Sequence, residues 1–191
     1  MDTRKLIGVA AVALAALALW PRRASAFALP VLSRRSGADG MDLVRSTIER
    51  HEGRVPYVYK DQAGHDTFGI GHRLTSADAG LRQYTRSNPA PAAVVDALFA
   101  QDVARFVAVV DGLRLPLTAS QRAALVSLAF NIGSGSFTAS TLAAKLRSGD
   151  WRGAADQFAA WSKITDPKTG AKVSSAGLAR RRADERALFL A

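Results

Sequence analysis

Residues 51–72, HEGRVPYVYKDQAGHDTFGIGH, mark the point at which the chain changes from helix to strand. Upstream, apolar residues recur at the spacing of one helix face, and a glycine and a proline then end the pattern: Met41, Val44, Ile48, Gly53 and Pro56. Two short strand-prone runs follow, at 57–59 and 67–70, with a turn between them. The stretch therefore predicts a helix that leads into a small antiparallel hairpin, with a third strand reaching Leu74.

The chain after the loop SNPAP is predicted to be helical. Pro91 suits the first position of a helix, and Thr118 with Gln121 has the spacing of a capping box. With the apolar periodicity and the glycine breaks, these signals predict helices at residues 91–111, 118–131, 138–148, 151–162 and 176–190. The expected fold class is α+β, with a small hairpin lobe, a larger helical lobe, and a groove between them that suits an extended ligand.

The composition favours certain classes of binding partner but does not identify one of them. Lys and Arg number 26 against 16 Asp and Glu, which gives a net charge of +10. This charge favours a polyanionic partner such as nucleic acid, anionic lipid or an anionic bacterial wall polymer, and a basic solvated surface with no special partner is the alternative. The chain has no cysteine, which excludes a disulfide framework and a thiolate metal site.

The first 26 residues have the features of an export segment. Arg4 and Lys5 precede an uncharged run over residues 6–20, and Ala24-Ser25-Ala26 has the small-x-small form of a cleavage site. As a helix the run would extend about 22 Å, short of the roughly 30 Å hydrocarbon core of a bilayer. It is therefore expected as a cleaved signal or as an anchor that is released from the membrane, with a permanent anchor as the third alternative. Residues 27–40 are expected to form a linker, and residues 41–191 the folded domain.

The hairpin region carries the residue types that cleave glycosidic bonds. Such cleavage needs one carboxyl group that donates a proton and a second, ionised one that activates water. Glu52 continues the apolar helix stripe, where partial desolvation favours its protonated form, whereas Asp61 falls in a polar turn that keeps it ionised. Thr67, on the returning strand, is expected to face Asp61 across the hairpin and to hold the water. On spacing alone, an N-cap or a surface ion pair would also explain these carboxylates.

The order of short motifs identifies a family resemblance. The chain resembles the T-even phage lysozyme and endolysin family (glycoside hydrolase family 24) over about residues 42–190, at these positions: Glu52-Gly53, Tyr59-Lys60-Asp61, Thr67-Phe68-Gly69-Ile70-Gly71-His72, Ala129-Phe130-Asn131-Ile132-Gly133, Ser140-Thr141-Leu142, Gly177-Leu178, Arg181-Arg182 and Glu185-Arg186-Ala187-Leu188-Phe189. The resemblance implies a lysozyme-like two-lobe fold with the active site in the cleft. It also implies a monomeric muramidase that needs no cofactor and cleaves the β-1,4 bond between N-acetylmuramic acid and N-acetylglucosamine in peptidoglycan, with inversion.

The resemblance also implies roles for individual residues. Glu52 corresponds to the acid, Asp61 to the water-activating carboxylate and Thr67 to the water-positioning hydroxyl. Asn131 matches a substrate-contact position, although a role as helix C-cap is the alternative. In the family a basic residue near the last helix pairs with the acid, and it corresponds to one of the run at 180–182, Arg180-Arg181-Arg182. Such a pairing favours the ionised acid, against the effect of desolvation, and the sequence leaves open which effect is larger.

The export segment agrees with this family. A wall hydrolase acts in the periplasm, and a weakly hydrophobic helix resembles the segment of signal-anchor-release endolysins, which stay tethered to the inner membrane until it depolarises. Residues 6–20 would form that transient tether if they are not cleaved. The expected role is host-cell lysis.

Several alternatives compete with this interpretation. His51, His65 and His72 lack acidic partners at metal-ligand spacing, so no metal site is expected. Trp151 and Trp161 are expected in the core rather than as sugar platforms. A non-enzymatic cationic binder that disrupts walls or membranes through its basic last helix is the main alternative function, and a lytic transglycosylase is the alternative within enzymes. Nucleic acid binding through the arginine run is disfavoured by the export segment.

Overall fold

The computed structural model describes residues 34–61, 64–166 and 169–191. The predicted export segment at 1–26 and the first part of the predicted linker lie outside these residues. The first described element is helix α2 (Arg34–Glu52), which begins seven residues before Met41. The end of the predicted linker at 34–40 is therefore helical, because its two glycines lower helix stability by only about 1 kcal/mol each and no proline interrupts it.

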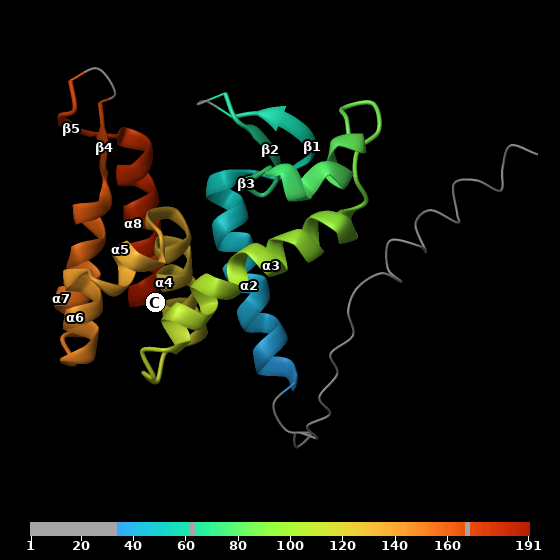
Figure 1. Ribbon diagram of the computed structural model, residues 1–191. Helices are drawn as coiled ribbons and strands as arrows, with labels where there is room; N and C mark the ends of the chain where they lie inside the picture. The colour runs from blue at the N-terminus through green and yellow to red at the C-terminus, as the bar shows by residue number, and fades with distance from the viewer. Residues whose placement is uncertain (1–33, 62–63, 167–168) are drawn as a thin grey trace, which may run out of the picture. The chain divides into compact units, whose positions relative to one another are not determined.

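The predicted hairpin is confirmed as a three-stranded antiparallel sheet of order β1-β2-β3. Its strands are β1 (Val55–Lys60), β2 (Asp66–Gly69) and β3 (His72–Arg73). Tyr59 pairs with Thr67, and the backbone N–H of Asp61 donates to the carbonyl of His65, which extends the ladder by one step. Figure 1 shows the C-terminal end of α2 beside this sheet. A 3₁₀ helix, η1 (Ser76–Gln83), follows the sheet and was not predicted.

The helical lobe agrees with most of the predicted boundaries. Its long helices are α3 (Ala92–Asp111), α4 (Ala119–Ile132) and α8 (Ala176–Leu190). Shorter helices connect them: α5 (Ser134–Thr138), α6 (Thr141–Arg147), α7 (Trp151–Asp156) and the 3₁₀ helix η2 (Gln157–Trp161). The capping box of Thr118 and Gln121 opens α4 as predicted. Pro91 is the N-cap of α3 rather than its first residue, because its ψ of 146° is extended.

One segment contradicts the prediction that the chain after residue 91 is helical throughout. A second hairpin, β4 (Lys163–Thr165) and β5 (Lys172–Ser174), precedes α8. All six of its strand residues are exposed. Each strand has only three residues, one apolar residue between two polar ones, which is too short for the alternation by which strands are recognised.

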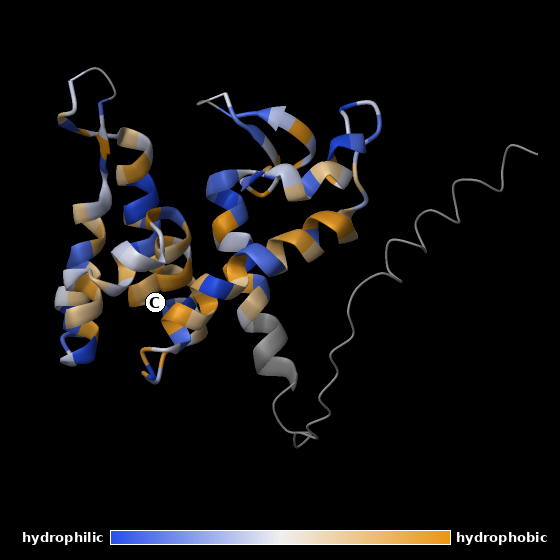
Figure 2. Ribbon diagram, viewed as in Figure 1, coloured by the Kyte–Doolittle hydropathy of each residue, from blue (hydrophilic) through white to orange (hydrophobic). Residues whose placement is uncertain are grey.

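The core is built around α4, which packs against α2, α3 and α8. Seven consecutive residues of α4, Ala123 to Ala129, are buried, so the helix is covered on nearly all sides. Hydrophobic residues are concentrated in α3 and α4, whereas the first hairpin is largely hydrophilic (Figure 2). Trp151 and Trp161 pack against the core as predicted, and the ring of Trp151 stacks on Phe189 with centroids 6.3 Å apart.

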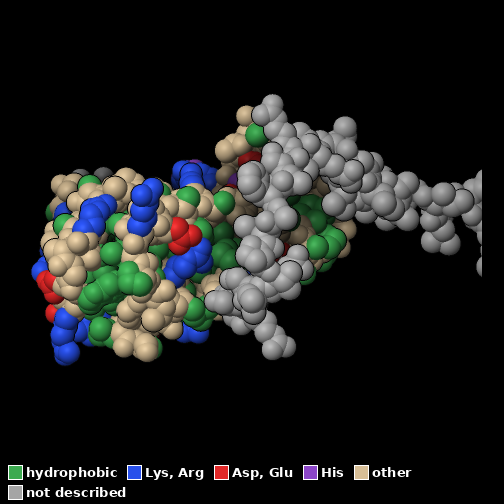
Figure 3. Space-filling model, turned by 90° about the horizontal axis from the view of Figure 1, so that it is seen from below, with side chains coloured by type: hydrophobic (Ala, Val, Ile, Leu, Met, Phe, Trp, Pro, Cys, Tyr) green, Lys and Arg blue, Asp and Glu red, His purple; other side chains and the backbone are tan. Residues whose placement is uncertain are grey.

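The surface is basic but shows no single charged face in the view from below. Lys and Arg side chains are dispersed there among hydrophobic and other side chains (Figure 3). In the described part of the chain, no helix is both long enough and apolar enough to cross a membrane.

Candidate active site

Glu52 is the last residue of α2, at the point where the helix meets the sheet. Its side chain is 25% exposed, so one side of the carboxylate is accessible. Helix α2 ends here because Gly53 adopts φ of +77°, a left-handed conformation that favours glycine and stops the helix. On the buried side, Arg181 Nη1 donates to Glu52 Oε1 over 2.5 Å. Oε2 faces Gly71 in the turn between β2 and β3.

The structure selects Arg181 from the three consecutive arginines of α8. Arg180 is exposed, whereas Arg181 and Arg182 are buried. Arg181 contacts the carboxylate of Glu52 and, on α4, the carbonyl oxygen and hydroxyl of Ser127 at 3.3 and 3.4 Å. Two of the three arginines therefore face inwards, which leaves the last helix less basic on its surface than its sequence indicates.

Behind Arg181 lies a buried carboxylate that the sequence analysis did not single out. Glu185 is fully buried and accepts hydrogen bonds from the Ser127 hydroxyl at 2.6 Å and from Arg181 Nε at 3.1 Å. Arg182 Nη2 donates to the same oxygen of Glu185 at 3.1 Å. Burial raises the pKa of Glu185, while the two arginines and the serine hydroxyl act in the opposite direction. The spacing of three and four residues before Glu185 was the available signal, because it places all three side chains on one helix face.

Asp61 follows β1 and is fixed by the turn that it opens. Its Oδ1 accepts from the backbone N–H of His65 at 2.8 Å, and the His65 ring nitrogen Nδ1 lies 3.4 Å from the same oxygen. The Asp61 side chain is 32% exposed. The carboxylate is therefore held to the turn through Oδ1, and part of the side chain is accessible to solvent.

Thr67 is buried on β2, only 4% exposed, and its hydroxyl donates to the carbonyl oxygen of His65 at 3.2 Å. It lies opposite Tyr59 rather than opposite Asp61, which corrects the predicted cross-hairpin pair. Because Asp61 is two residues beyond Tyr59, and side chains alternate along a strand, Asp61 and Thr67 occupy diagonal positions on one face of the hairpin.

The side chain of Tyr59 is influenced by both candidate catalytic carboxylates, Glu52 and Asp61. The pKa of its hydroxyl is raised by burial first, and then by the negative charges of Glu52 and Asp61. Both carboxylates therefore act on one side chain, although Glu52 comes from α2 and Asp61 from the hairpin. The structure thus brings the predicted acid and the predicted water-activating residue into the same region.

Asn131 lies in the last turn of α4 and is exposed. The alternative role as a C-cap is wrong, because Gly133 caps this helix with φ of +87°, where a left-handed residue is required. Its neighbour Phe130 lines a cavity of about 440 Å³ that also borders Gly71, the glycine in contact with Glu52. The remaining lining residues are His72, Arg73, Thr75, Gln101, Asp102, Arg105 and Phe106.

The three histidines have separate structural environments. His72 bonds within the fold, with Nδ1 2.8 Å from Asp102 Oδ2 and Nε2 3.4 Å from Asp78 Oδ2. His51 precedes Glu52, and its pKa is lowered by burial first and then by the charge of Arg181. Within the described ranges, no group of three His, Cys, Asp or Glu side chains could hold a metal ion.

Comparison with known proteins matches residues 49–185 to the phage lysozyme family. The chain belongs to the phage lysozyme family. An endolysin of Acyrthosiphon pisum secondary endosymbiont phage 1 is 36% identical over 145 residues, which cover 74% of this chain and 91% of that protein. A SAR-endolysin of Escherichia phage Mu is 34% identical over 143 residues, covering 74% of this chain and 79% of the relative.

Solved structures confirm the lysozyme-like α+β fold. The endolysin of Escherichia coli O157:H7 phage FAHEc1 superposes with a TM-score of 0.66 at 29% identity, covering 82% of the present chain and 93% of that endolysin. A mutant of P22 lysozyme gives a TM-score of 0.63 at 29% identity, over 78% of this chain and 96% of that one. Membership in this family supports a hydrolase that acts on peptidoglycan and lyses the host cell.

Proposed function

We propose that this member of the phage lysozyme family is a muramidase that hydrolyses the β-1,4 bond between N-acetylmuramic acid and N-acetylglucosamine, with inversion. The observation that carries the proposal is the placement of the two carboxylates: Glu52 ends α2 with Oε2 facing Gly71 in the β2–β3 turn, and Asp61 follows β1 of the same sheet. Their environments differ, because Glu52 is bonded to a buried arginine and Asp61 lies in an accessible turn. Two unlike carboxyl groups are what acid-base cleavage of a glycoside requires.

In this proposal Glu52 protonates the leaving oxygen of the sugar linkage. Its Oε1 already accepts a hydrogen bond from Arg181, so the proton would be carried by Oε2, the oxygen on the side of Gly71. After donation the carboxylate is negative, and the guanidinium of Arg181 stabilises that charge. Arg181 would therefore assist the step in which the proton leaves Glu52.

Asp61 would activate the attacking water and Thr67 would position it. Asp61 Oδ1 accepts from the backbone N–H of His65, and the side chain is 32% exposed, so water can reach the carboxylate and give up a proton to it. The Thr67 hydroxyl donates to the carbonyl of His65, so its oxygen lone pairs are oriented to accept a hydrogen bond from the same water. Their shared face of the hairpin supports this division of roles.

Substrate would extend along the cavity that borders Gly71 and Phe130. We propose that Asn131 contacts the glycan there, because its amide is exposed beside the Phe130 position and both donates and accepts hydrogen bonds. Half-buried Phe130 would add an apolar side chain to this surface, whereas Phe106 is only 4% exposed and packs against Phe130.

A glutamine substitution tests the acid. Glu52→Gln keeps the shape of the side chain but removes the ionisable proton, so release of reducing ends from purified peptidoglycan should fall by at least about 10²-fold. The matched control is Glu49→Gln, one turn earlier on α2, where the carboxylate is 3.6 Å from Arg54. Peptidoglycan hydrolysis by the Glu52→Gln variant at the wild-type rate would overturn the proposal. Retained lysis of whole cells without reducing-end release would instead support the cationic binder.

The products distinguish hydrolysis from the alternative enzyme reaction. A muramidase gives a hydrated reducing end, and inversion of the β bond gives the α-anomer first, whereas a lytic transglycosylase gives anhydro-muramyl ends. Mass spectrometry of the digest distinguishes hydrated from anhydro-muramyl ends. Time-resolved proton NMR of a soluble glycan fragment shows which anomer forms first. Anhydro-muramyl products would replace the proposed reaction.

We propose that residues 1–26 carry the protein across the inner membrane to the periplasm as a releasable signal anchor. The relatives from phage Mu and phage P21 are SAR-endolysins. The uncharged run at 6–20, which is too short to span a bilayer stably, supports the same behaviour here. Intact mass of the exported protein tests the proposal: the uncleaved chain is expected, and an N-terminus at Phe27 would instead show a cleaved signal.

A further inference from the structure

The buried face of α8 carries more charge than the contact with Glu52 uses. Arg182 and Glu185 are 1% and 0% exposed, and Arg181 is 6% exposed. Burying ionised side chains is costly unless they are paired, so a cluster of three on one helix indicates mutual compensation. One carboxylate between two arginines leaves a net charge of +1 in this cluster, facing the carboxylate of Glu52.

Arg181 is shared between two carboxylates. Its Nη1 donates to Glu52, and its Nε donates to Glu185 at 3.1 Å. If Glu185 were neutral, Glu52 would be the only carboxylate bonded to this guanidinium, and its ionised form would be favoured more strongly. The charge on Glu185 therefore weakens the hold of Arg181 on the ionised acid.

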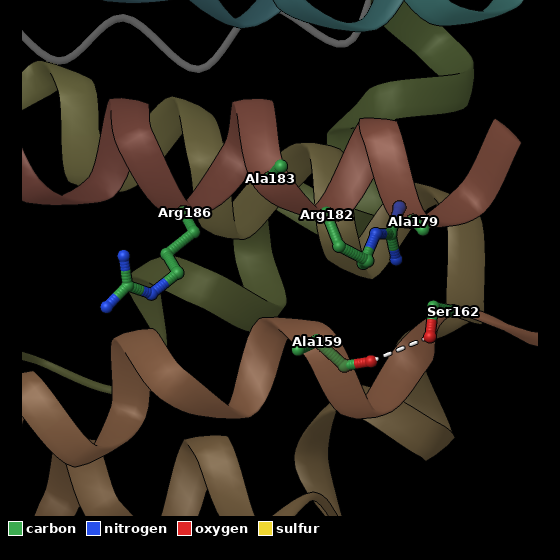
Figure 4. A pocket seen from close by; sticks show the side chains of 6 residues that line it. All are labelled: Ala159, Ser162, Ala179, Arg182, Ala183 and Arg186. Carbon is green, nitrogen blue, oxygen red and sulfur yellow. Dashed lines mark hydrogen bonds between the residues drawn. The ribbon is translucent and has the colours of Figure 1, made fainter. Parts of the chain in front are cut away.

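Arg182 completes the cluster from the other side. Its side chain extends from α8 into the space between α8 and η2, beside a cavity of about 190 Å³ whose lining includes three alanines (Figure 4). Its Nη2 bonds Glu185 at 3.1 Å, and its Nε lies 3.0 Å from the second oxygen of Glu185. Burial lowers the pKa of Arg182 to about 10, and the charge of Glu52 is among the influences that raise it. The two charges therefore interact although no direct contact joins them.

We propose that Arg182 and Glu185 are positioning residues that act through Arg181 to set how readily Glu52 keeps its proton. Glu185 favours the protonated acid by neutralising Arg181, and Arg182 opposes it by neutralising Glu185. The three residues would thus fix the upper pH limit at which the enzyme is active. This inference rests on the proposed role of Glu52 as the acid.

Other groups near Glu52 have less influence on how readily it keeps its proton. On the hairpin, burial first and then the negative charges of Glu52 and Asp61 raise the pKa of Tyr59, so its hydroxyl stays neutral over the pH range of interest. On α2, His51 is uncharged at neutral pH because burial and then Arg181 lower its pKa, with Asp184 of α8 acting in the opposite direction. Helix α4 contributes the uncharged Ser127, and the β2–β3 turn contributes Gly71.

Two substitutions that remove charges of opposite sign test the inference. The basic limb of the kcat/KM profile reports loss of the proton from the acid of the free enzyme. Glu185→Gln removes a negative charge, so the limb should move to lower pH by about one pH unit, whereas Arg182→Met removes a positive charge and should move it to higher pH by a similar amount. The controls are Ser127→Ala and Arg182→Lys, which alter the same contacts but keep the charges. Their limbs should stay at the wild-type pH, whatever their turnover.

Profiles are measured on purified peptidoglycan with the full chain, and thermal unfolding verifies that each variant is folded at the assay temperature. Should one variant fail to fold, the other decides, because each predicts its own direction. A merely structural role would lower turnover in both without opposite shifts. Limbs that do not move, or that move in the same direction, overturn the inference. If Glu52→Gln is inactive in the same assay, such a result leaves the proposed function intact, whereas an active Glu52→Gln refutes that function itself.

Discussion

Gly71 lies against the carboxylate of Glu52, and a Cβ atom on Gly71 would lie 3.5 Å from Glu52 Oε2. Gly71 also adopts φ of +73° in the turn that joins β2 to β3. The same glycine therefore allows the tight turn and leaves space beside one oxygen of the candidate acid. A side chain at this position would interfere with both functions.

Replacing Gly71 by alanine should reduce activity more than stability. The left-handed backbone conformation costs an alanine roughly 1–2 kcal/mol, and its methyl group would shield Oε2 from substrate. We expect kcat/KM to fall by about tenfold or more. Gly149→Ala is the matched control, because Gly149 has φ of +80° with open space around it. Equal activity in the two variants, measured on peptidoglycan, would show that the proximity to Glu52 has no effect.

Conservative substitutions can test separately the residues that would position and activate the attacking water. Thr67→Val keeps the shape of a buried side chain and removes the hydroxyl, so we expect a fall in kcat of about 10²-fold with little loss of stability. Thr67→Ser restores the hydroxyl and should recover most of the activity. Asp61→Asn should lower kcat to a similar extent as Thr67→Val. Full turnover by the valine or asparagine variant would remove the assigned role from that residue.

The contact between His72 and Asp102 should contribute measurably to stability. The His72 side chain is 16% exposed and the Asp102 side chain 25%, so loss of the 2.8 Å contact leaves a partly buried imidazole with one fewer partner. Asp102→Ala should lower the free energy of unfolding by about 1–3 kcal/mol in urea titrations. Asp42→Ala is the control, since Asp42 is 68% exposed and its bond to Arg45 should contribute less than about 1 kcal/mol. Similar losses in the two variants would contradict this assignment.

The order of the elements was predictable wherever local chemistry determines it. The capping box of Thr118 and Gln121 fixes the start of α4 through bonds between neighbours in sequence, and the glycine pattern after Glu52 fixes the first hairpin. The exposed strands at 163–165 and 172–174 were missed because no burial pattern distinguishes them from a loop. Local signals thus identify elements that are capped or half-buried.

Sequence reasoning could predict only those features of the site that depend on a single helix or hairpin. Arg181 could not be chosen among three consecutive arginines, because the inward side of a helix depends on how α8 docks against α4 and η2. Glu185 was missed for the same reason, since a glutamate on a basic helix reads as a surface ion pair until its burial is known. The facing of Tyr59 and Thr67 likewise required the strand register.

Asp66 should make the first hairpin sensitive to acid. Its carboxylate bonds Lys60 at 2.8 Å and Arg82 at 2.6 Å, and these hydrogen bonds lower its pKa from 3.8 to about 2. A lowered folded-state pKa contributes stability that is present above the unfolded value and is lost as the pH falls towards the folded one. The wild type should therefore melt at a higher temperature than Asp66→Asn, and this difference should be largest above about pH 4. The difference in melting temperature should narrow from about pH 4 to pH 2. Lys60→Met, which leaves Arg82 in place, should show a smaller dependence of the same sign. A gap that stays constant down to pH 2 would mean that the ion pairs of Asp66 do not stabilise the sheet.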